Sequence, residues 1–190
     1  MGTRGKRRII DNHVENSQSN NAVLLRSASD LRDLGRRYNC YDNLALRIED
    51  LVQYIPDISL ENVEMDSTLS GSLSKRGGAW LIKVNKYHSL TRKRFTIAHE
   101  LGHYIYHKDD YEEDSQHEFV DTTFFRGMTS NNLEYTANRF ASELLMPEED
   151  VRRLIDNDNI RSISDLALQF GVSSAAMLYR VKELNYKTKE

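Results

Sequence analysis

His99, Glu100 and His103 form a His-Glu-x-x-His pattern within the segment from Phe95 to Tyr104. On a helix of about 3.6 residues per turn, positions 99 and 103 share one face, so both imidazoles can reach one zinc ion at about 2.0–2.1 Å. Glu100 lies about a quarter-turn round the helix, where its carboxylate can take a proton from a metal-bound water without binding the metal. The pattern therefore predicts a zinc site with His99 and His103 as ligands and Glu100 as general base.

A catalytic zinc site needs a third protein ligand and one open position. The segment from Asn132 to Pro147 predicts a second helix, because Asn132 can cap it, Pro147 can stop it and hydrophobic residues recur at helical spacing. If this helix crosses the first, Glu134 can supply the third ligand. Asn138, one turn further along the same face, can then hydrogen-bond a ligand imidazole and fix its tautomer.

Other side chains compete with Glu134 for the third position. His107 lies one turn beyond the second motif histidine, but a helix cannot readily bring three successive turns onto one tetrahedral metal. Asp109 stands where His-Glu-x-x-His-x-x-Gly-x-x-His proteases have their third ligand, but Tyr106 replaces the glycine that turns that chain. Glu143 is about two and a half turns from Glu134. We therefore expect Glu134 to be the ligand; its alternative is a surface carboxylate near a helix N-terminus.

The segments before the motif must position it. Thr91 is the predicted N-cap of the motif helix. Hydrophobic residues at helical spacing from Asp42 to Tyr54, followed by Pro56, predict a helix packed behind the motif helix. A shorter helix, capped by Ser29 and Asp30, is predicted to run through Arg37.

Hydrophobic residues alternate in short runs between Val63 and Val84, which predicts two or three antiparallel strands. Lys75–Gly78 predicts a hairpin turn, and Ala79–Asn85 is the clearest strand. Because this strand directly precedes the motif, it could form the rim of a cleft and offer backbone groups to an extended peptide. The alternative is an ordinary core strand, and both can be true. One more strand is predicted from His117 to Asp121 and Thr123 to Phe125.

The composition suits a globular protein, since 39% of the 190 residues are hydrophobic and 29% are charged. The net charge of −3 gives no overall attraction to nucleic acid. The single cysteine, Cys40, excludes an internal disulfide framework and favours a reducing compartment. Neither a membrane-spanning run nor the hydrophobic core of a signal peptide is found, so we expect a cytoplasmic location.

We predict three parts along the chain. Residues 1–21 form a disordered basic tail, for which a nucleic-acid arm or a targeting patch is the alternative. Residues 22–147 form a metallopeptidase core, and residues 148–190 form a helical extension. The tail composition, a run of Arg and Lys followed by Asn, Ser and Gln, cannot bury enough hydrophobic surface to fold.

Within the extension, Ser164–Leu184 indicates two helices joined by a turn at Gly171, with Ser164 and Ser173 as caps. The second helix of such a pair can bind DNA. Here it offers few basic side chains, because Arg180 and Lys182 come late and most other positions are hydrophobic. We therefore expect the pair to pack on the core and do not expect it to bind nucleic acid directly.

Two motifs together resemble the ImmA/IrrE family of zinc metallopeptidases. They are the segment Arg94–His103 and the pattern Glu134-x-x-Ala137-Asn138-x-Phe140-Ala141 that leads to Leu144-Leu145-Met146-Pro147. The resemblance covers roughly residues 40–185. It implies an α+β, zincin-like (gluzincin-like) core, in which a small antiparallel sheet packs on the active-site helix, with a helix-turn-helix-like extension at the C-terminal end.

The resemblance also implies the roles of four residues and the class of substrate. His99, His103 and Glu134 would bind Zn²⁺, and Glu100 would be the catalytic base. Family members commonly act inside cells on helix-turn-helix repressors, which implies such a protein substrate. Many members have Glu directly before the Ala-Asn pair, where this chain has Thr136.

The sequence therefore predicts a zinc-dependent endopeptidase acting on an intracellular protein. The alternative is a DNA- or partner-binding regulator, or a toxin–antitoxin component, that keeps the metal site without proteolysis. Four side chains are open as a second donor to the oxyanion, and the sequence does not choose among them: Tyr104, Tyr106, His107 and Tyr135. The oligomeric state is also not predicted.

Overall fold

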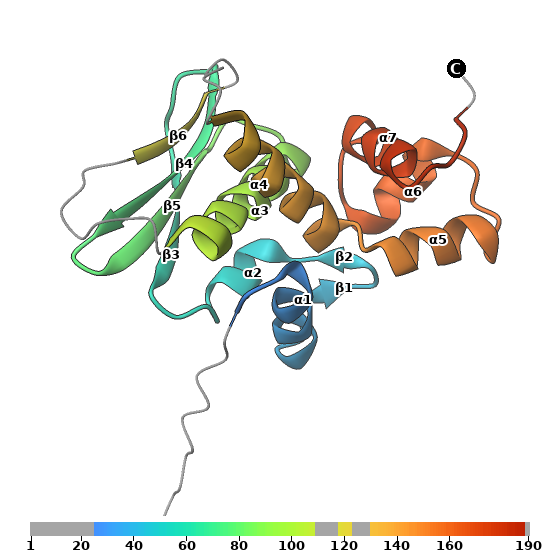
Figure 1. Cartoon of the computed structure of the whole chain (residues 1–190), viewed down its shortest axis with the longest axis horizontal. Helices are drawn as coiled ribbons and strands as arrows, with labels where there is room; N and C mark the ends of the chain where they lie inside the picture. Colours follow the sequence, from blue (N-terminus) through green and yellow to red (C-terminus); the bar gives the residue numbers. More distant parts are fainter. Residues whose placement is uncertain (1–24, 109–117, 123–129, 189–190) are drawn as a thin grey trace, which may run out of the picture.

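The computed structural model of the protein describes residues 25–108, 118–122 and 130–188 (Figure 1). A four-stranded sheet lies at one end, helices α3 (Leu90–His107) and α4 (Ser130–Leu145) lie beside it, and three shorter helices lie beyond α4. The predicted α+β class is confirmed. Among the described residues, no helix combines the length and hydrophobicity that crossing a bilayer requires.

The sheet has the order β3-β5-β4-β6. Its strands are β3 (Ile58–Val63), β4 (Leu69–Arg76), β5 (Ala79–Asn85) and β6 (Glu118–Thr122). The β4–β5 and β4–β6 pairs are antiparallel, but β3 and β5 are parallel. The prediction of a purely antiparallel sheet is therefore wrong. Strand directions alternate along the chain, yet β5 lies between β3 and β4, so the two strands that run the same way become neighbours.

Strand β5 is one of the two inner strands, with β3 on one side and β4 on the other. Its backbone groups are used in both ladders, so the prediction that they are free for an extended peptide is wrong. The alternative is right, since Trp80, Ile82 and Val84 are buried in the core. The predicted hairpin turn is confirmed between Arg76 and Ala79, which face each other across the β4–β5 pair.

The first part of the chain differs from its prediction. Helix α1 (Ala28–Arg37) is capped by Ser27, so the predicted start is two residues late. In place of the predicted helix from Asp42 to Tyr54, the chain forms a short hairpin followed by a helix of five residues. These elements are β1 (Tyr41–Asp42), β2 (Ala45–Leu46) and α2 (Ile48–Val52). Asn43 has a left-handed φ of 54°, which a helix interior does not tolerate, and this turn interrupts the helical hydrophobic pattern.

The motif helix and the extension follow their predictions with shifts at the caps. Ser89, not Thr91, caps α3, because its side chain accepts the backbone N–H of Arg92. Past Pro147 the chain forms α5 (Glu148–Asp156), α6 (Ile163–Phe170) and α7 (Ser174–Glu183). Ser173 caps α7 as predicted, whereas Ser162 takes the place predicted for Ser164 at α6. A serine caps a helix only where its hydroxyl reaches the free N–H groups, and several serines here compete for that position.

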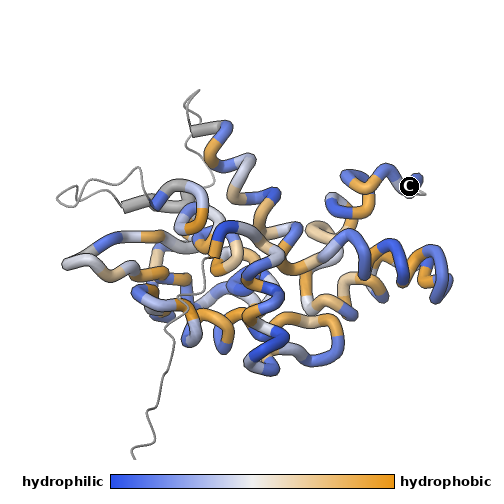
Figure 2. Tube along the Cα trace, turned by 60° about the horizontal axis from the view of Figure 1, so that its bottom comes forward, coloured by the Kyte–Doolittle hydropathy of each residue, from blue (hydrophilic) through white to orange (hydrophobic). Residues whose placement is uncertain are grey.

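One hydrophobic core includes residues from both predicted parts, 22–147 and 148–190. Hydrophobic positions recur along one side of the helices, as Figure 2 shows. Two buried arginines join the parts through backbone carbonyls. Arg94 of α3 donates to Phe170 at the end of α6, and Arg180 of α7 donates to Met146 just after α4.

Several predictions lie outside the described residues. These are the basic tail 1–21, the candidate ligand Asp109 and the segment from Thr123 to Phe125. The remaining part of the last predicted strand is confirmed as β6.

Candidate metal centre

Helices α3 and α4 cross at a glycine, and this crossing brings the candidate ligands together. A Cβ atom placed on Gly102 would lie 3.0 Å from Cα and 3.2 Å from the carbonyl oxygen of Ala137. The two backbones can therefore approach closely only because position 102 has no side chain. Glu134 lies about one turn before Ala137, so the same approach places its carboxylate beside His99 and His103.

The three side chains converge on one point. Nε2 of His99 lies 3.1 Å from Nε2 of His103. Oε2 of Glu134 lies 3.2 Å from His99 Nε2, and its Oε1 lies 3.4 Å from His103 Nε2. Three ligand atoms around a tetrahedral zinc, at bonds of about 2.0–2.1 Å, are separated by about 3.3–3.4 Å. The observed separations, which involve both carboxylate oxygens of Glu134, are of this size, and one ligand atom from each of the three side chains lies within 4.8 Å of the other two.

The chemistry of these atoms also fits a cation. A carboxylate only accepts hydrogen bonds, and a neutral imidazole has one nitrogen without a proton, so such atoms repel unless a proton or a metal lies between them. His99, His103 and Glu134 are the group of three metal-ligating side chains that the described part of the chain brings together. Two imidazoles and one carboxylate are the ligand set of many catalytic zinc sites. These residues could therefore hold a metal ion.

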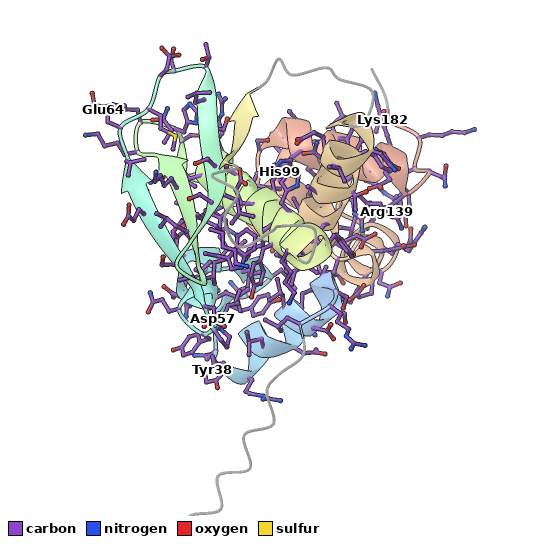
Figure 3. All side chains as sticks on the ribbon, turned by 60° about the vertical axis from the view of Figure 1, so that its left-hand side comes forward. Tyr38, Asp57, Glu64, His99, Arg139 and Lys182 are labelled. Carbon is purple, nitrogen blue, oxygen red and sulfur yellow. The ribbon has the colours of Figure 1, made fainter. Side chains whose placement is uncertain are left out.

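The site is buried on the α3 side and open on the α4 side. His99 is 3% exposed, whereas Glu100 and His103 are each 1% exposed. The side chain of Glu134 remains partly exposed. The His103 and His99 side chains, which lie within hydrogen-bonding distance, hold the pKa of the Glu134 carboxyl well below its usual range, so this group carries a negative charge where a cation would bind. Figure 3 shows His99 between the sheet and the C-terminal helices.

Asn138 takes the position expected for a residue that orients a ligand. Its Oδ1 lies 3.1 Å from Nδ1 of His99. Because an amide oxygen accepts, Nδ1 of His99 is the donor, and Nε2 is then left without a proton. This is the nitrogen that faces Glu134 and His103. A fixed tautomer of this kind makes His99 ready to bind a metal.

A small pocket of about 160 Å³ opens beside the candidate ligands. Its lining includes His99, Glu134 and Asn138 together with Ser70, Arg92, Phe95 and Thr96. Sequence reasoning missed Ser70 and Arg92. Arg92 precedes His99 by seven residues, which puts both on one helix face, and this spacing could have identified it. No sequence pattern identifies Ser70, because it reaches the pocket from the separate strand β4.

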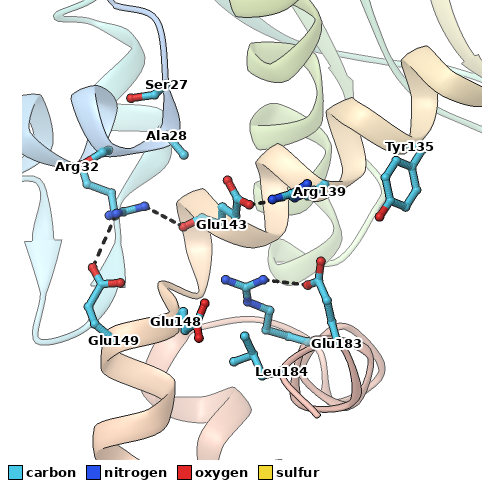
Figure 4. A pocket seen from close by; sticks show the side chains of 12 residues that line it. Ser27, Ala28, Arg32, Tyr135, Arg139, Glu143, Glu148, Glu149, Glu183 and Leu184 are labelled. Carbon is cyan, nitrogen blue, oxygen red and sulfur yellow. Dashed lines mark hydrogen bonds and ion pairs between the residues drawn. The ribbon is translucent and has the colours of Figure 1, made fainter.

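The other candidates take different places. Glu143 pairs with Arg139 at 2.9 Å and lines a separate pocket with Tyr135, shown in Figure 4. Tyr104 packs its ring edge-on against Trp80 of the sheet, and Tyr106 packs against Phe140. None of these tyrosines lines the pocket of His99. The side chain of His107 lies outside the described residues.

The geometry agrees with the comparison of this chain with known proteins. The model of the peptidase family described as the IrrE N-terminal-like domain matches residues 54–182, more than half of the chain. The chain belongs to the ImmA/IrrE family of metallopeptidases. The resemblance found in the sequence is thereby confirmed. The matched stretch contains all three side chains of the candidate metal centre and extends through most of α7.

This ImmA/IrrE chain is also similar to the metallopeptidase ImmA of Bacillus subtilis (strain 168). The two share 29% identity over 105 residues, which are 55% of this chain and 57% of that relative. The chain therefore spans little more than half the length of the curated relative that it matches. A metallopeptidase family implies a metal cofactor, and the three side chains described above could hold one.

Proposed function

We propose that this protein is a zinc-dependent endopeptidase whose metal ligands are His99, His103 and Glu134. The observation that carries the proposal is the mutual approach of their Nε2 and carboxylate oxygen atoms to 3.1–3.4 Å at the crossing of α3 and α4. Two imidazoles and one carboxylate favour zinc, which is bound by the same ligand set in other peptidases.

A zinc ion held there would supply Lewis-acid chemistry, lowering the pKa of a water molecule and polarising the carbonyl group of the scissile peptide bond. The chain itself supplies the positions and the proton transfers. Asn138 holds the tautomer of His99, and the α3–α4 crossing at Gly102 holds Glu134 against both histidines.

Glu100 is proposed as the general base. Its carboxylate accepts a proton from the attacking water and returns it to the amine nitrogen that leaves when the peptide bond breaks. Glu100 follows His99 on α3 and is buried, with Oε1 facing Gly71 of strand β4. It is not part of the His99–His103–Glu134 group, which suits a base that acts beside the metal rather than on it.

We propose an intracellular protein as the substrate, and specifically a helix-turn-helix repressor or an antitoxin-like partner. The support is the family membership together with the helix-turn-helix repressors on which its members commonly act. The single, buried Cys40 accords with a reducing, cytoplasmic location.

The decisive experiment incubates the zinc-loaded full-length protein with a helix-turn-helix repressor encoded beside its gene and identifies products by mass spectrometry. Glu100→Gln should keep the fold and the zinc but cleave about 10²–10⁴-fold more slowly. Glu134→Ala should lower the zinc content measured by elemental analysis. If Glu134→Ala retains full zinc, the third ligand lies elsewhere.

The same variant separates an enzyme from a regulator that works by binding. If Glu100→Gln keeps its zinc and its biological effect is unchanged, proteolysis is not the mechanism. The protein would then act as a DNA- or partner-binding regulator.

A further inference from the structure

The pocket beside the candidate metal ligands contains a cation, Arg92, that pairs with no carboxylate in the part of the chain that the structure describes. Arg92, in the first turn of α3, donates from Nη2 to Ser70 Oγ at 2.8 Å and from Nε to the same oxygen at 3.3 Å. Within residues 25–108, 118–122 and 130–188, no carboxylate pairs with this guanidinium. By contrast, Arg139 and Arg152 pair with Glu143 and Glu148 of their own helices.

The orientation of Arg92 is restricted by two hydrogen bonds to Ser70. Ser70 is buried and extends from strand β4, so the two hydrogen bonds connect the exposed guanidinium to the sheet. A free arginine loses considerable side-chain entropy when it binds a ligand, and the two hydrogen bonds to Ser70 have already removed part of that freedom. These two bonds use Nε and Nη2, and the other N–H groups of the guanidinium can still donate to a ligand.

The spacing along α3 places Arg92 one side chain away from the candidate metal. Positions 92 and 99 are about two turns, or about 10.5 Å, apart on the same helix face. A pocket of about 160 Å³ lies between them and is walled by Phe95. At about 30 Å³ for each water molecule, this volume corresponds to about five waters, enough for one amino-acid side chain.

We propose that Arg92, held by Ser70, binds a carboxylate of the substrate directly next to the scissile peptide bond. This inference rests on the proposed peptidase function and adds the substrate class. The carboxylate is either an aspartate or glutamate side chain or the free C-terminal carboxylate of the substrate. A guanidinium fits both, because its N–H groups match the two oxygens of a carboxylate.

The first test measures binding, without cleavage. Small hydroxamates, which chelate the metal, are prepared with an Asp, an Asn or a Leu side chain next to the hydroxamate and with a free or an amidated carboxyl end. Their affinities for the zinc-loaded full-length protein are measured by calorimetry. The wild type should prefer a carboxylate over its amide by about 3- to 10-fold, since Arg92 is largely exposed to water.

Variants assign the preference to Arg92. Arg92→Gln should abolish the preference for a carboxylate while leaving the affinity for the Leu hydroxamate unchanged. Arg92→Lys should keep only part of the preference, because lysine lacks the paired N–H donors of the guanidinium. Lys93→Gln is the matched control: it removes the neighbouring cation, which donates to Asn62 Oδ1 outside the pocket, and the preference should persist. An equal loss of affinity for all hydroxamates in Arg92→Gln would overturn the proposal and give Arg92 a structural role.

The second test measures cleavage of a peptide library with one varied position on each side of the scissile bond. A preference for Asp or Glu identifies the side chain as the carboxylate, whereas a requirement for a free C-terminus identifies the terminal carboxylate. Cleavage without either preference, with no selectivity among the hydroxamates, refutes the subsite. If no peptide or protein is cleaved although the hydroxamate preference persists, the peptidase function fails and the carboxylate site stands.

Discussion

The guanidinium of Arg94 donates to the carbonyl oxygen of Phe170 at 3.0 Å and thereby joins the motif helix α3 to the end of α6. The same Nη2 donates to the carbonyl oxygen of Leu46 at 2.8 Å. Burial lowers the pKa of Arg94, because the charge is removed from water. The residue that follows Phe170, Gly171, has a left-handed φ of 61° and lies directly against the guanidinium.

Gly171→Ala should therefore destabilise the protein for two reasons. A left-handed φ costs an L-residue about 1–2 kcal/mol. In addition, the new Cβ would lie 2.6 Å from Nη1 of Arg94, which is buried and cannot move freely. Gly77→Ala is the matched control, since Gly77 has a φ of 55° but no atoms within 4 Å of a Cβ. Thermal unfolding should show a larger loss for Gly171→Ala; equal losses would mean that the Arg94 contact contributes nothing.

Gly102→Ala should weaken metal binding. In a helix, alanine is more stable than glycine by about 1 kcal/mol. Here, however, the new Cβ would meet the backbone of Ala137 and push α4, which carries Glu134, away from the histidines. Gly35→Ala in α1 has the same helical advantage and would meet only side-chain atoms of Leu46, Tyr41 and Leu51. Zinc affinity measured by competition with a chelator should fall for Gly102→Ala alone. Unchanged affinity would show that α4 can move without loss of the ligand geometry.

Asn138→Ala should lower zinc affinity by about 10- to 100-fold, as is typical when the hydrogen bond behind a histidine ligand is removed. The reason is that His99 Nδ1 loses its acceptor at 3.1 Å, so the tautomer is no longer fixed. The adjacent residue Arg139, which is exposed and pairs with Glu143, provides the control Arg139→Ala. Chelator competition should distinguish the two variants, and equal affinities would remove Asn138 from the site.

Cys40 should resist alkylation in the folded protein. Burial raises the pKa of its thiol, with a further rise from the nearby Asp50 carboxylate. In the unfolded chain the thiol has its ordinary pKa of about 8.5. The thiol therefore contributes full stability below this value, and the contribution is lost as the pH rises toward the folded-state pKa. Denaturant titrations should show a steeper loss of stability above about pH 8.5 for the wild type than for Cys40→Ala. Rapid reaction of the native protein with iodoacetamide would contradict the predicted resistance of Cys40 to alkylation.

The extension should bind duplex DNA weakly or not at all. Arg180 is buried, donating from Nε to Met146 and from Nη1 to Glu183, so it cannot contact phosphates. On α7 this leaves Lys182 as the exposed cation. Fluorescence anisotropy at about 150 mM salt should show no submicromolar binding. Salt-sensitive binding that is lost in Lys182→Ala would instead favour the regulator.

Removing the extension should destabilise the whole chain. Truncation after Pro147 deletes the buried Phe170, Met177 and Val181, and it also removes the Arg180 contact to the end of α4. A cooperative thermal transition at an unchanged temperature would show that residues 22–147 fold independently. Calorimetry of the truncated and full-length chains provides the comparison.

The sequence alone was sufficient for features that depend on neighbours along the chain. The spacing of His99 and His103 fixes their common helix face, and Gly77-Gly78 fixes a tight hairpin turn. The family follows from the same local motifs. Such features depend on helical geometry and on backbone preferences of a few residues, both of which are written in a short stretch of sequence.

Tertiary structure decided the features that depend on residues far apart. Nothing local could reveal that β5 lies between β3 and β4, because strand order depends on how whole elements pack. At Asn43 the chain turns and interrupts the predicted helix, although the hydrophobic residues around it recur at helical spacing. Likewise, the sequence could identify Glu134 only as a candidate ligand, because its approach to His99 depends on the crossing of α3 and α4 at Gly102. The contact of Ser70 with Arg92 was not predictable either, because Ser70 lies on a separate strand. Contacts of this kind form only when distant segments share one core, and their geometry is set by packing rather than by spacing along the chain.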